Sequence, residues 1–190
     1  MKLRIVVVGI PGVGKTTVVE KLKSVLEGSQ LVTFGSVMLE EGMRLKWIRH
    51  RDELRRLPVE KQRMLQRMAA SKISRMGRKV LLVDTHLFVR TKEGFWPGLP
   101  FDVVRKLRPT HLILVEASPD EILQRRMSDK TRYRDKATKE ELQAELALAR
   151  SFLTVSSTLT GAPMLIANNA QGKADELASS LAATIREAAG

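Results

Sequence analysis

The sequence contains no cysteine and few aromatic residues. Without cysteine the chain can form no disulfide bond, bind no metal through thiolates and use no cysteine nucleophile. Only 4% of the residues are aromatic, and the sequence shows neither the stacking pattern of an RNA-binding sheet nor a zinc finger. These absences weigh against a nucleic-acid-binding module.

Long apolar runs are also missing, because no run approaches the roughly 20 residues that a membrane span needs. The first residues lead directly into a predicted core strand with no small-residue cleavage site after them, so we expect no secretory signal. The lack of cysteine is compatible with a reducing compartment. We therefore expect a cytoplasmic protein without a membrane partner, whose 190 residues suit one domain, 1–190.

Acidic residues are too few to balance the basic ones, which leaves a formal net charge of +12. The basic surface either faces a polyanionic substrate, contacts nucleic acid, or is solvated without a specific role. Lysine and arginine are spread along the chain without interleaved aromatics. This distribution favours a small phosphate-rich substrate over nucleic acid.

A phosphate-binding loop is the strongest motif in the sequence. The apolar run 5–8 predicts a buried parallel strand, Gly9-x-x-x-x-Gly14-Lys15-Thr16 follows it, and an amphipathic segment continues to about Leu26. Such a loop aims backbone N–H groups at a phosphate chain, while its lysine reaches the β- and γ-phosphates. The alternative is a glycine-rich turn with an exposed lysine. The predicted nucleotide contacts are Gly9, Ile10, Pro11, Gly12, Val13, Gly14, Lys15, Thr16 and Thr17.

An aspartate ends a second apolar run, 79–83. In a chain with a phosphate loop, an acidic residue at the carboxyl end of a buried strand matches the Walker B arrangement. We expect Asp84 and the Thr16 hydroxyl to hold Mg²⁺, directly or through water. The alternative for Asp84 is an ordinary strand-end residue that caps the next turn.

Strands and helices alternate along the whole chain. Further strands are predicted at 30–34, 110–115 and 162–167, and the segments between them carry helical patterns and caps. Phe88–Pro100 shows no pattern, and we expect an irregular loop that forms a ligand wall. The sequence predicts an α/β fold with a five-stranded parallel sheet, helices on both faces and ligands at the carboxyl ends of the strands.

Two further segments are suited to phosphate groups. Ser36 is predicted to cap a helix that begins at Val37, within a helical region at about 35–76, and the start of this helix is suited to an anion. The arginine-rich segment at about 125–138 interrupts the helical pattern, and we interpret it as a short lid whose guanidinium groups bind the transferred phosphoryl. The alternative is a basic solvated turn. Thr138 and Glu141 predict a capping box for the next helix.

These features favour a small-molecule phosphotransferase among nucleotide-binding proteins. The sequence has no Asn-Lys-x-Asp motif and no Asp-x-x-Gly after Asp84, which argues against a GTPase switch. The chain is short for a mechanical ATPase. A phosphotransferase needs two facing phosphate sites, and the sequence offers both.

The motifs resemble those of the archaeal type of adenylate kinase along nearly the whole chain. They read GIPGVGKTT, FGSVM, HRDELRRLP, VDTH, PGLP, LVEASPDEILQRRMSDKTRYRD and TGAPMLIANN, in this order. The resemblance implies reversible transfer, ATP + AMP ⇌ 2 ADP, with ATP as a substrate, Mg²⁺ on the ATP, and a homotrimer. The lid lacks cysteine, so a zinc-bearing lid is excluded.

The resemblance also implies roles for individual residues. Lys15 would stabilise the transferred phosphoryl, and Asn168 would lie in the turn that passes the adenine of ATP. Ser36 resembles the monophosphate-binding side, where one of three arginines would supply a guanidinium, Arg51, Arg55 or Arg90. The lid arginines that grip the phosphates would be Arg125, Arg132 and Arg134.

Two competing functions stay open from the residues themselves. A kinase for another monophosphate, such as UMP or CMP, would share the phosphate machinery and differ in the base pocket. A basic nucleotide-binding protein that uses ATP to regulate contact with RNA or DNA would bind nucleic acid in a salt-sensitive manner.

Overall fold

The apolar runs of the sequence form the central sheet of the computed structural model, which describes residues 2–91, 93–128 and 137–187. Five parallel strands lie in the order β2-β3-β1-β6-β7. Their bounds are β1 (Leu3–Val8), β2 (Ser29–Thr33), β3 (Val80–Asp84), β6 (His111–Glu116) and β7 (Met164–Asn168). The predicted five-stranded parallel sheet is confirmed.

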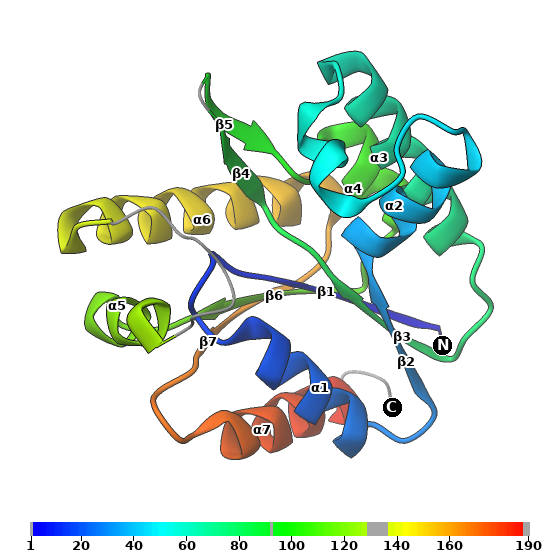
Figure 1. Ribbon diagram of the computed structural model, residues 1–190. Helices are drawn as coiled ribbons and strands as arrows, with labels where there is room; N and C mark the ends of the chain where they lie inside the picture. Colours follow the sequence, from blue (N-terminus) through cyan, green and yellow to red (C-terminus); the bar gives the residue numbers. More distant parts are fainter. Residues whose placement is uncertain (1, 92, 129–136, 188–190) are drawn as a thin grey trace.

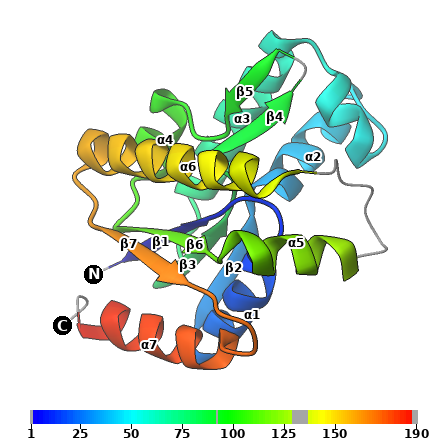
Figure 2. The same ribbon diagram turned by 90° about the vertical axis from the view of Figure 1, so that its left-hand side faces the viewer.

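Helices cover both faces of this sheet (Figures 1 and 2). One face carries α1 (Lys15–Val25) and α7 (Ala174–Glu187), which pack against each other. The other face carries α3 (Val59–Ser74), α4 (Phe101–Leu107) and α6 (Lys139–Thr160). The strands between the two layers are the core, because burial on both faces requires the continuous Val, Ile and Leu runs that they have.

Shorter elements lie at the carboxyl ends of the strands. α2 (Phe34–Arg44) follows β2 directly and packs on α3, and the 3₁₀ helix η1 (Arg51–Arg56) contacts α2. α5 (Pro119–Ser128) follows β6 and packs on α6. Among the described residues, no helix combines the length and apolarity that a membrane span requires.

The start of α2 differs from the sequence-based prediction. The helix begins at Phe34, so Thr33 occupies the N-cap position and Ser36 lies within the first turn. The prediction that Ser36 caps the helix is therefore wrong. Phe34 continues the apolar pattern of β2, but it is the first residue of α2 and its ring is buried in the core. Periodicity over five residues does not show whether such a residue ends a strand or begins a helix.

The segment predicted as an irregular loop forms a β-ribbon instead. β4 (Phe88–Thr91) and β5 (Gly94–Pro97) pair antiparallel. The Phe88 ring packs edge-on against Phe95 and also contacts Phe152 of α6, with ring centroids 5.0 and 5.6 Å apart. Glycine and proline interrupt this segment, so its alternation of apolar and polar residues is too short to predict strands. The packing of Phe88 on α6 stabilises the two-stranded ribbon.

The capping box of α6 is confirmed. The Thr138 hydroxyl accepts a hydrogen bond from the N–H of Glu141, whose carboxylate accepts one from the N–H of Thr138. The helix runs to Thr160, a turn beyond the predicted end at about Ser156, and stops where Gly161 adopts a φ of 70°.

Candidate active site

The phosphate loop connects β1 to α1 at the carboxyl edge of the sheet (Figure 1). Gly9 lies so close to the neighbouring strand that a Cβ there would be 2.7 Å from the Val115 carbonyl oxygen. Gly14 has a φ of 80° and immediately precedes Lys15, the first residue of α1. The two glycines therefore permit the tight turn that directs the loop N–H groups and the positive end of α1 toward one point.

The side chains of Lys15 and Asp84 meet beside this loop. Asp84 ends β3, the strand beside β1, and pairs in register with Val7. The Lys15 ammonium group contacts the Asp84 carboxylate, and only 8% of the lysine side chain is exposed. A buried cation and an acidic group therefore lie at the base of the loop.

Two arginines at the end of α5 hold the loop from the outside. Arg125 Nη1 donates to the Val13 carbonyl at 3.0 Å, and Arg126 donates to the Pro11 carbonyl at 3.0 Å from Nε and 2.7 Å from Nη2. Charged donors make the stronger class of hydrogen bond. Arg126 also donates to a carbonyl of the loop, that of Pro11, but sequence reasoning selected only Arg125.

The turn after β7 closes the far side of the loop. Asn169 is buried, and its Nδ2 donates to the Val13 carbonyl at 2.8 Å, while its own carbonyl accepts from Arg125 Nη2 at 2.8 Å. Its Oδ1 is buried without a hydrogen-bond partner among the described residues. By contrast, the side chain of Asn168 is exposed. Sequence reasoning selected Asn168 and missed its neighbour, since the Asn-Asn pair alone does not show which side chain turns inward.

Glu121 ties α5 to the same turn. Its Oε1 accepts a hydrogen bond from the N–H of Gln171 at 2.6 Å. The Ser118 hydroxyl, followed by the backbone N–H groups of Ser118 and Gln171, holds the pKa of the Glu121 carboxyl below its usual value. The carboxylate thus stays charged beside Arg125, whose Nη2 lies 3.7 Å from it.

The predicted monophosphate side is only partly assembled from the residues that the sequence suggested. A Cβ on Gly35 would lie 3.1 Å from Arg51 Nη2, so this guanidinium lies against the first turn of α2, next to Ser36. Arg55 is exposed on η1. Of the three candidate arginines, Arg51 is the one whose guanidinium lies against Gly35, the residue before Ser36.

Arg90 lies on the β-ribbon and faces α6. Its guanidinium nitrogens are 3.6 Å from carboxylate oxygens of Glu141 and of Glu145. Glu145 is buried and is also 3.7 Å from Arg126 Nη2, which contacts the phosphate loop. Arg90 is therefore linked to the loop through a shared carboxylate. The remaining lid residues, Arg132 and Arg134, lie outside the described residues.

The residues at the loop fit a magnesium ion held together with substrate phosphates. Mg²⁺ usually takes one or two protein oxygens and completes its shell with water and phosphate oxygen. The Thr16 side chain is exposed at the start of α1, and Asp84 reaches the loop through its contact with Lys15. Within residues 2–91, 93–128 and 137–187, no cluster of three or more histidine or acidic residues offers a metal cage.

A phosphate loop between the first strand and first helix of a parallel sheet defines a P-loop nucleotide-binding protein. In agreement, a family model described as an AAA domain matches residues 8–143. The fold is that of small P-loop kinases: the shikimate kinase of Bacteroides thetaiotaomicron superimposes with a TM-score of 0.65 at 14% identity, over 97% of this chain and 98% of that one.

Sequence comparison narrows the class. Adenylate kinase from Methanopyrus kandleri is 40% identical over 96% of this chain and 97% of its own length. Adenylate kinase from Methanocaldococcus jannaschii is 41% identical over 87% of this chain and 88% of its own. The protein belongs to the adenylate kinase family. The resemblance of its motifs to this family is therefore confirmed.

Proposed function

We propose that this protein catalyses ATP + AMP ⇌ 2 ADP and so maintains the balance of adenine nucleotides. The observation that carries the proposal is the 40% identity to an adenylate kinase over 185 residues, which extends far beyond the P-loop. The nucleoside monophosphate kinase class follows from the family. The choice of AMP as acceptor is the proposed step.

On the ATP side, Gly9–Thr17 would bind the phosphate chain through backbone N–H groups and the Lys15 ammonium group. Arg125 and Asn169 would position the loop, since both donate to the Val13 carbonyl. Mg²⁺ would be held by Thr16 and Asp84, and when bound it would neutralise charge on the phosphates. Asn168 stays a predicted neighbour of the adenine.

On the monophosphate side, Ser36 and Arg51 would bind the phosphate of AMP. The support is their shared position at the first turn of α2, where helix N–H groups favour an anion. Arg55 and Arg90 stay predictions for this site. Arg125, Arg132 and Arg134 stay predictions for binding the transferred phosphoryl.

The reaction asks little covalent chemistry of the protein. A phosphate oxygen of AMP is a nucleophile at neutral pH, so no general base is required, and alignment with charge stabilisation supplies the catalysis. In the forward direction the oxygen of AMP attacks the γ-phosphorus of ATP, the bond to the β-phosphate oxygen breaks, and ADP leaves. Lys15 would stabilise the negative charge that spreads over the equatorial oxygens. Closure of the lid would exclude water and prevent hydrolysis of ATP.

A homotrimer in the cytoplasm is the remaining part of the proposal, and ATP, AMP and ADP are its partners. Exposed apolar side chains on α6 and the edge strand β7 offer a surface for self-association, namely Val155, Leu159, Met164 and Ile166. The two elements are neighbours, because the Thr154 hydroxyl contacts the Met164 sulfur at 3.9 Å.

The test is a coupled assay of ADP production with Mg·ATP and each of AMP, CMP, UMP and GMP. We expect rapid turnover with AMP alone. A preference for CMP or UMP would retain the mechanism and contradict the proposed acceptor. The control is Lys15→Met, which should lose at least about 100-fold in kcat because a charged donor to the transition state is removed. Unchanged circular dichroism would show that the variant is folded, and full activity in it would overturn the P-loop assignment.

A further inference from the structure

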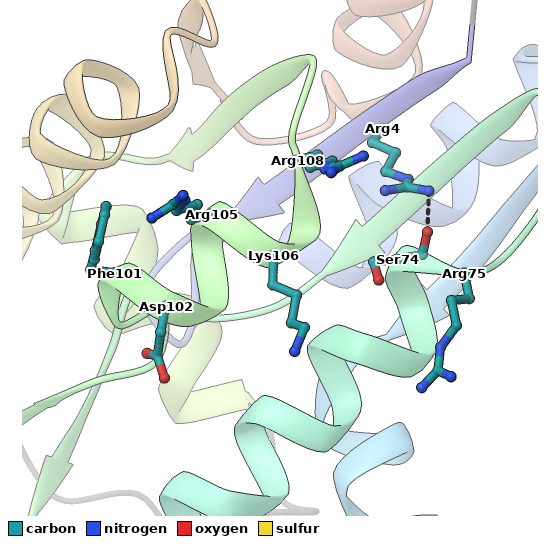
Figure 3. Close-up of a pocket in the computed structure, with 8 residues that line it drawn as sticks. All are labelled: Arg4, Ser74, Arg75, Phe101, Asp102, Arg105, Lys106 and Arg108. Atoms are coloured by element: carbon teal, nitrogen blue, oxygen red, sulfur yellow. Dashed lines mark hydrogen bonds between the residues drawn. The ribbon is translucent and has the colours of Figure 1, made fainter.

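A second basic pocket lies at the opposite edge of the sheet from the phosphate loop. Its volume is about 780 Å³, and it is lined by residues of β1, the end of α3, and α4 with the residue after it (Figure 3). The lining residues are Arg4, Ser74, Arg75, Phe101, Asp102, Arg105, Lys106 and Arg108. Arg4 is near the amino end of β1, whereas the loop follows its carboxyl end, so the sheet separates the two sites.

The pocket concentrates positive charge that carboxylates leave unbalanced. Asp102 is the sole acidic residue among those lining it, and its carboxylate is 2.6 Å from Arg67 Nε, outside the lining set. Within the described part of the chain, Arg75, Lys106 and Arg108 have no carboxylate within 4.0 Å. Arg75 donates from Nε and Nη2 to Ser71. An anion in the pocket would therefore meet cations whose charge no carboxylate neutralises.

Two of the cations lie close together. The Arg108 side chain is directed toward Arg4 at one end of the pocket, and the Arg4 guanidinium points to the Ser74 carbonyl (Figure 3). Arg4 donates to the carbonyls of Leu107 and Ser74, and burial, followed by the charge of Arg108, lowers the pKa of its guanidinium. Arg4 is thus fixed in place by backbone oxygens, and the repulsion it suffers from Arg108 is one that a bound anion would relieve.

The backbone at Arg108 adds an independent observation. This residue ends α4 with φ 50° and ψ 60°, a conformation that glycine or asparagine adopts with less strain. The left-handed turn directs an exposed arginine to the same pocket as Lys106, which extends from α4 toward α3 (Figure 3). Arg75 lines the pocket from the end of α3, where its guanidinium donates to Ser71.

We propose that this pocket binds a small anion with a chain of phosphate groups, such as an inorganic or nucleoside polyphosphate. Its volume falls in the range of small-molecule sites, and guanidinium groups bind phosphate oxygens in pairs. A nucleic acid fits less well, because Phe101 is the only aromatic residue in the lining and Arg105 lies over its ring at 5.8 Å. The site is separate from the proposed nucleotide sites.

The experiment is calorimetric titration of the full chain with inorganic tripolyphosphate. We expect two binding events per chain, one at the phosphate loop and one at the pocket. The double variant Lys106→Gln/Arg108→Asn should weaken one event by about tenfold for each cation removed and leave ADP production unchanged. Both side chains are exposed, and asparagine tolerates the positive φ, so the fold should persist. Lys15→Met should weaken the other event, which keeps the two sites distinguishable.

The matched control is Lys21→Gln/Lys23→Gln, which removes the same charge from α1 on the other face of the sheet. Its two binding events should match those of the unmodified protein. An equal loss in this control would show general charge attraction and overturn the proposal. Unchanged tripolyphosphate binding in Lys106→Gln/Arg108→Asn would also overturn the proposal. This conclusion holds even if that variant loses binding to a short single-stranded RNA.

Discussion

At the scale of single residues, Asn169 gives the sharpest test of the ATP side. Its side-chain amide is one of two donors to the Val13 carbonyl, so its removal leaves Arg125 as the remaining donor. Because one buried hydrogen bond is lost, Asn169→Ala should lower the free energy of unfolding by about 1 kcal/mol and raise the KM for ATP more than that for AMP.

Asn168→Ala is the matched control, because the neighbouring side chain is exposed. Its unfolding free energy should stay within about 0.5 kcal/mol of the unmodified protein. Urea unfolding and initial rates measure both variants. Equal effects at the two positions would contradict the assignment of the inward-facing asparagine.

His111 makes stability depend on pH. Its imidazole is buried with 5% of the residue exposed, and this burial lowers its pKa from 6.5. Below pH 6.5 the unfolded chain takes up a proton that the folded chain does not, so the free energy of unfolding should fall as the pH decreases toward the folded pKa. Above pH 6.5 both states are neutral and this contribution is constant.

His111→Gln should flatten the pH dependence just below pH 6.5, as measured by urea unfolding at a series of pH values. Glutamine does not titrate and can replace the contact between His111 Nδ1 and the Thr110 hydroxyl, which are 3.1 Å apart. His50→Gln is the control, since His50 is exposed. The same slope in His111→Gln and the unmodified protein would contradict the role of this histidine.

At the scale of the element, the start of α6 depends on its capping box. Thr138→Ala removes the oxygen that accepts the Glu141 N–H, and it should lower the free energy of unfolding by about 1 kcal/mol. Urea unfolding measures the change.

The same substitution within α6 provides the control. Thr158 is exposed and its hydroxyl only donates back to the Thr154 carbonyl at 3.0 Å, so Thr158→Ala should be neutral or slightly stabilising. A similar loss in both variants would mean that the cap contributes nothing beyond the local helix.

α5 and α6 both contribute side chains to the contacts around the phosphate loop. Arg126 reaches the loop carbonyl of Pro11 from the last turn of α5, and Glu145 of α6 lies beside its guanidinium. The charges of Arg90 and Arg126 compensate the buried Glu145 carboxylate, which would be costly to leave unpaired. The two helices thereby connect the β-ribbon to the loop.

At the scale of the whole molecule, self-association is the property to measure. Ile166 on the edge strand β7 is 52% exposed and belongs to the apolar surface of β7 and α6. If the trimer forms through this surface, Ile166→Glu should reduce the mass found by light scattering to that of a monomer, because it would bury an unpaired carboxylate.

Met127→Glu is the control, since Met127 is 79% exposed at the end of α5 and lies outside that surface. It should retain the mass of the unmodified protein. A trimer that persists in Ile166→Glu would place the interface elsewhere, and a monomeric unmodified protein would contradict the oligomer itself.

The sequence by itself determined the elements whose signals are local. The phosphate loop, the apolar run before Asp84 and the Thr138–Glu141 box each lie within a few residues, so spacing and residue type were sufficient to place them. Continuous apolar runs likewise predicted a parallel sheet, because strands buried on both faces show no alternation. The phosphate loop and the parallel sheet together predicted that ligands bind at the carboxyl edge of the sheet.

Tertiary structure alone decided the contacts between distant segments. Asn169, rather than Asn168, contacts the loop because side chains alternate at the end of β7, with Asn168 exposed and Asn169 buried. The β-ribbon is held by Phe152 of α6, which no local pattern indicates. The basic pocket joins β1, α3 and α4, whose cations are scattered in the sequence and converge only when the helices pack on the sheet. Residue spacing encodes short-range geometry, whereas these contacts depend on how all the layers pack together.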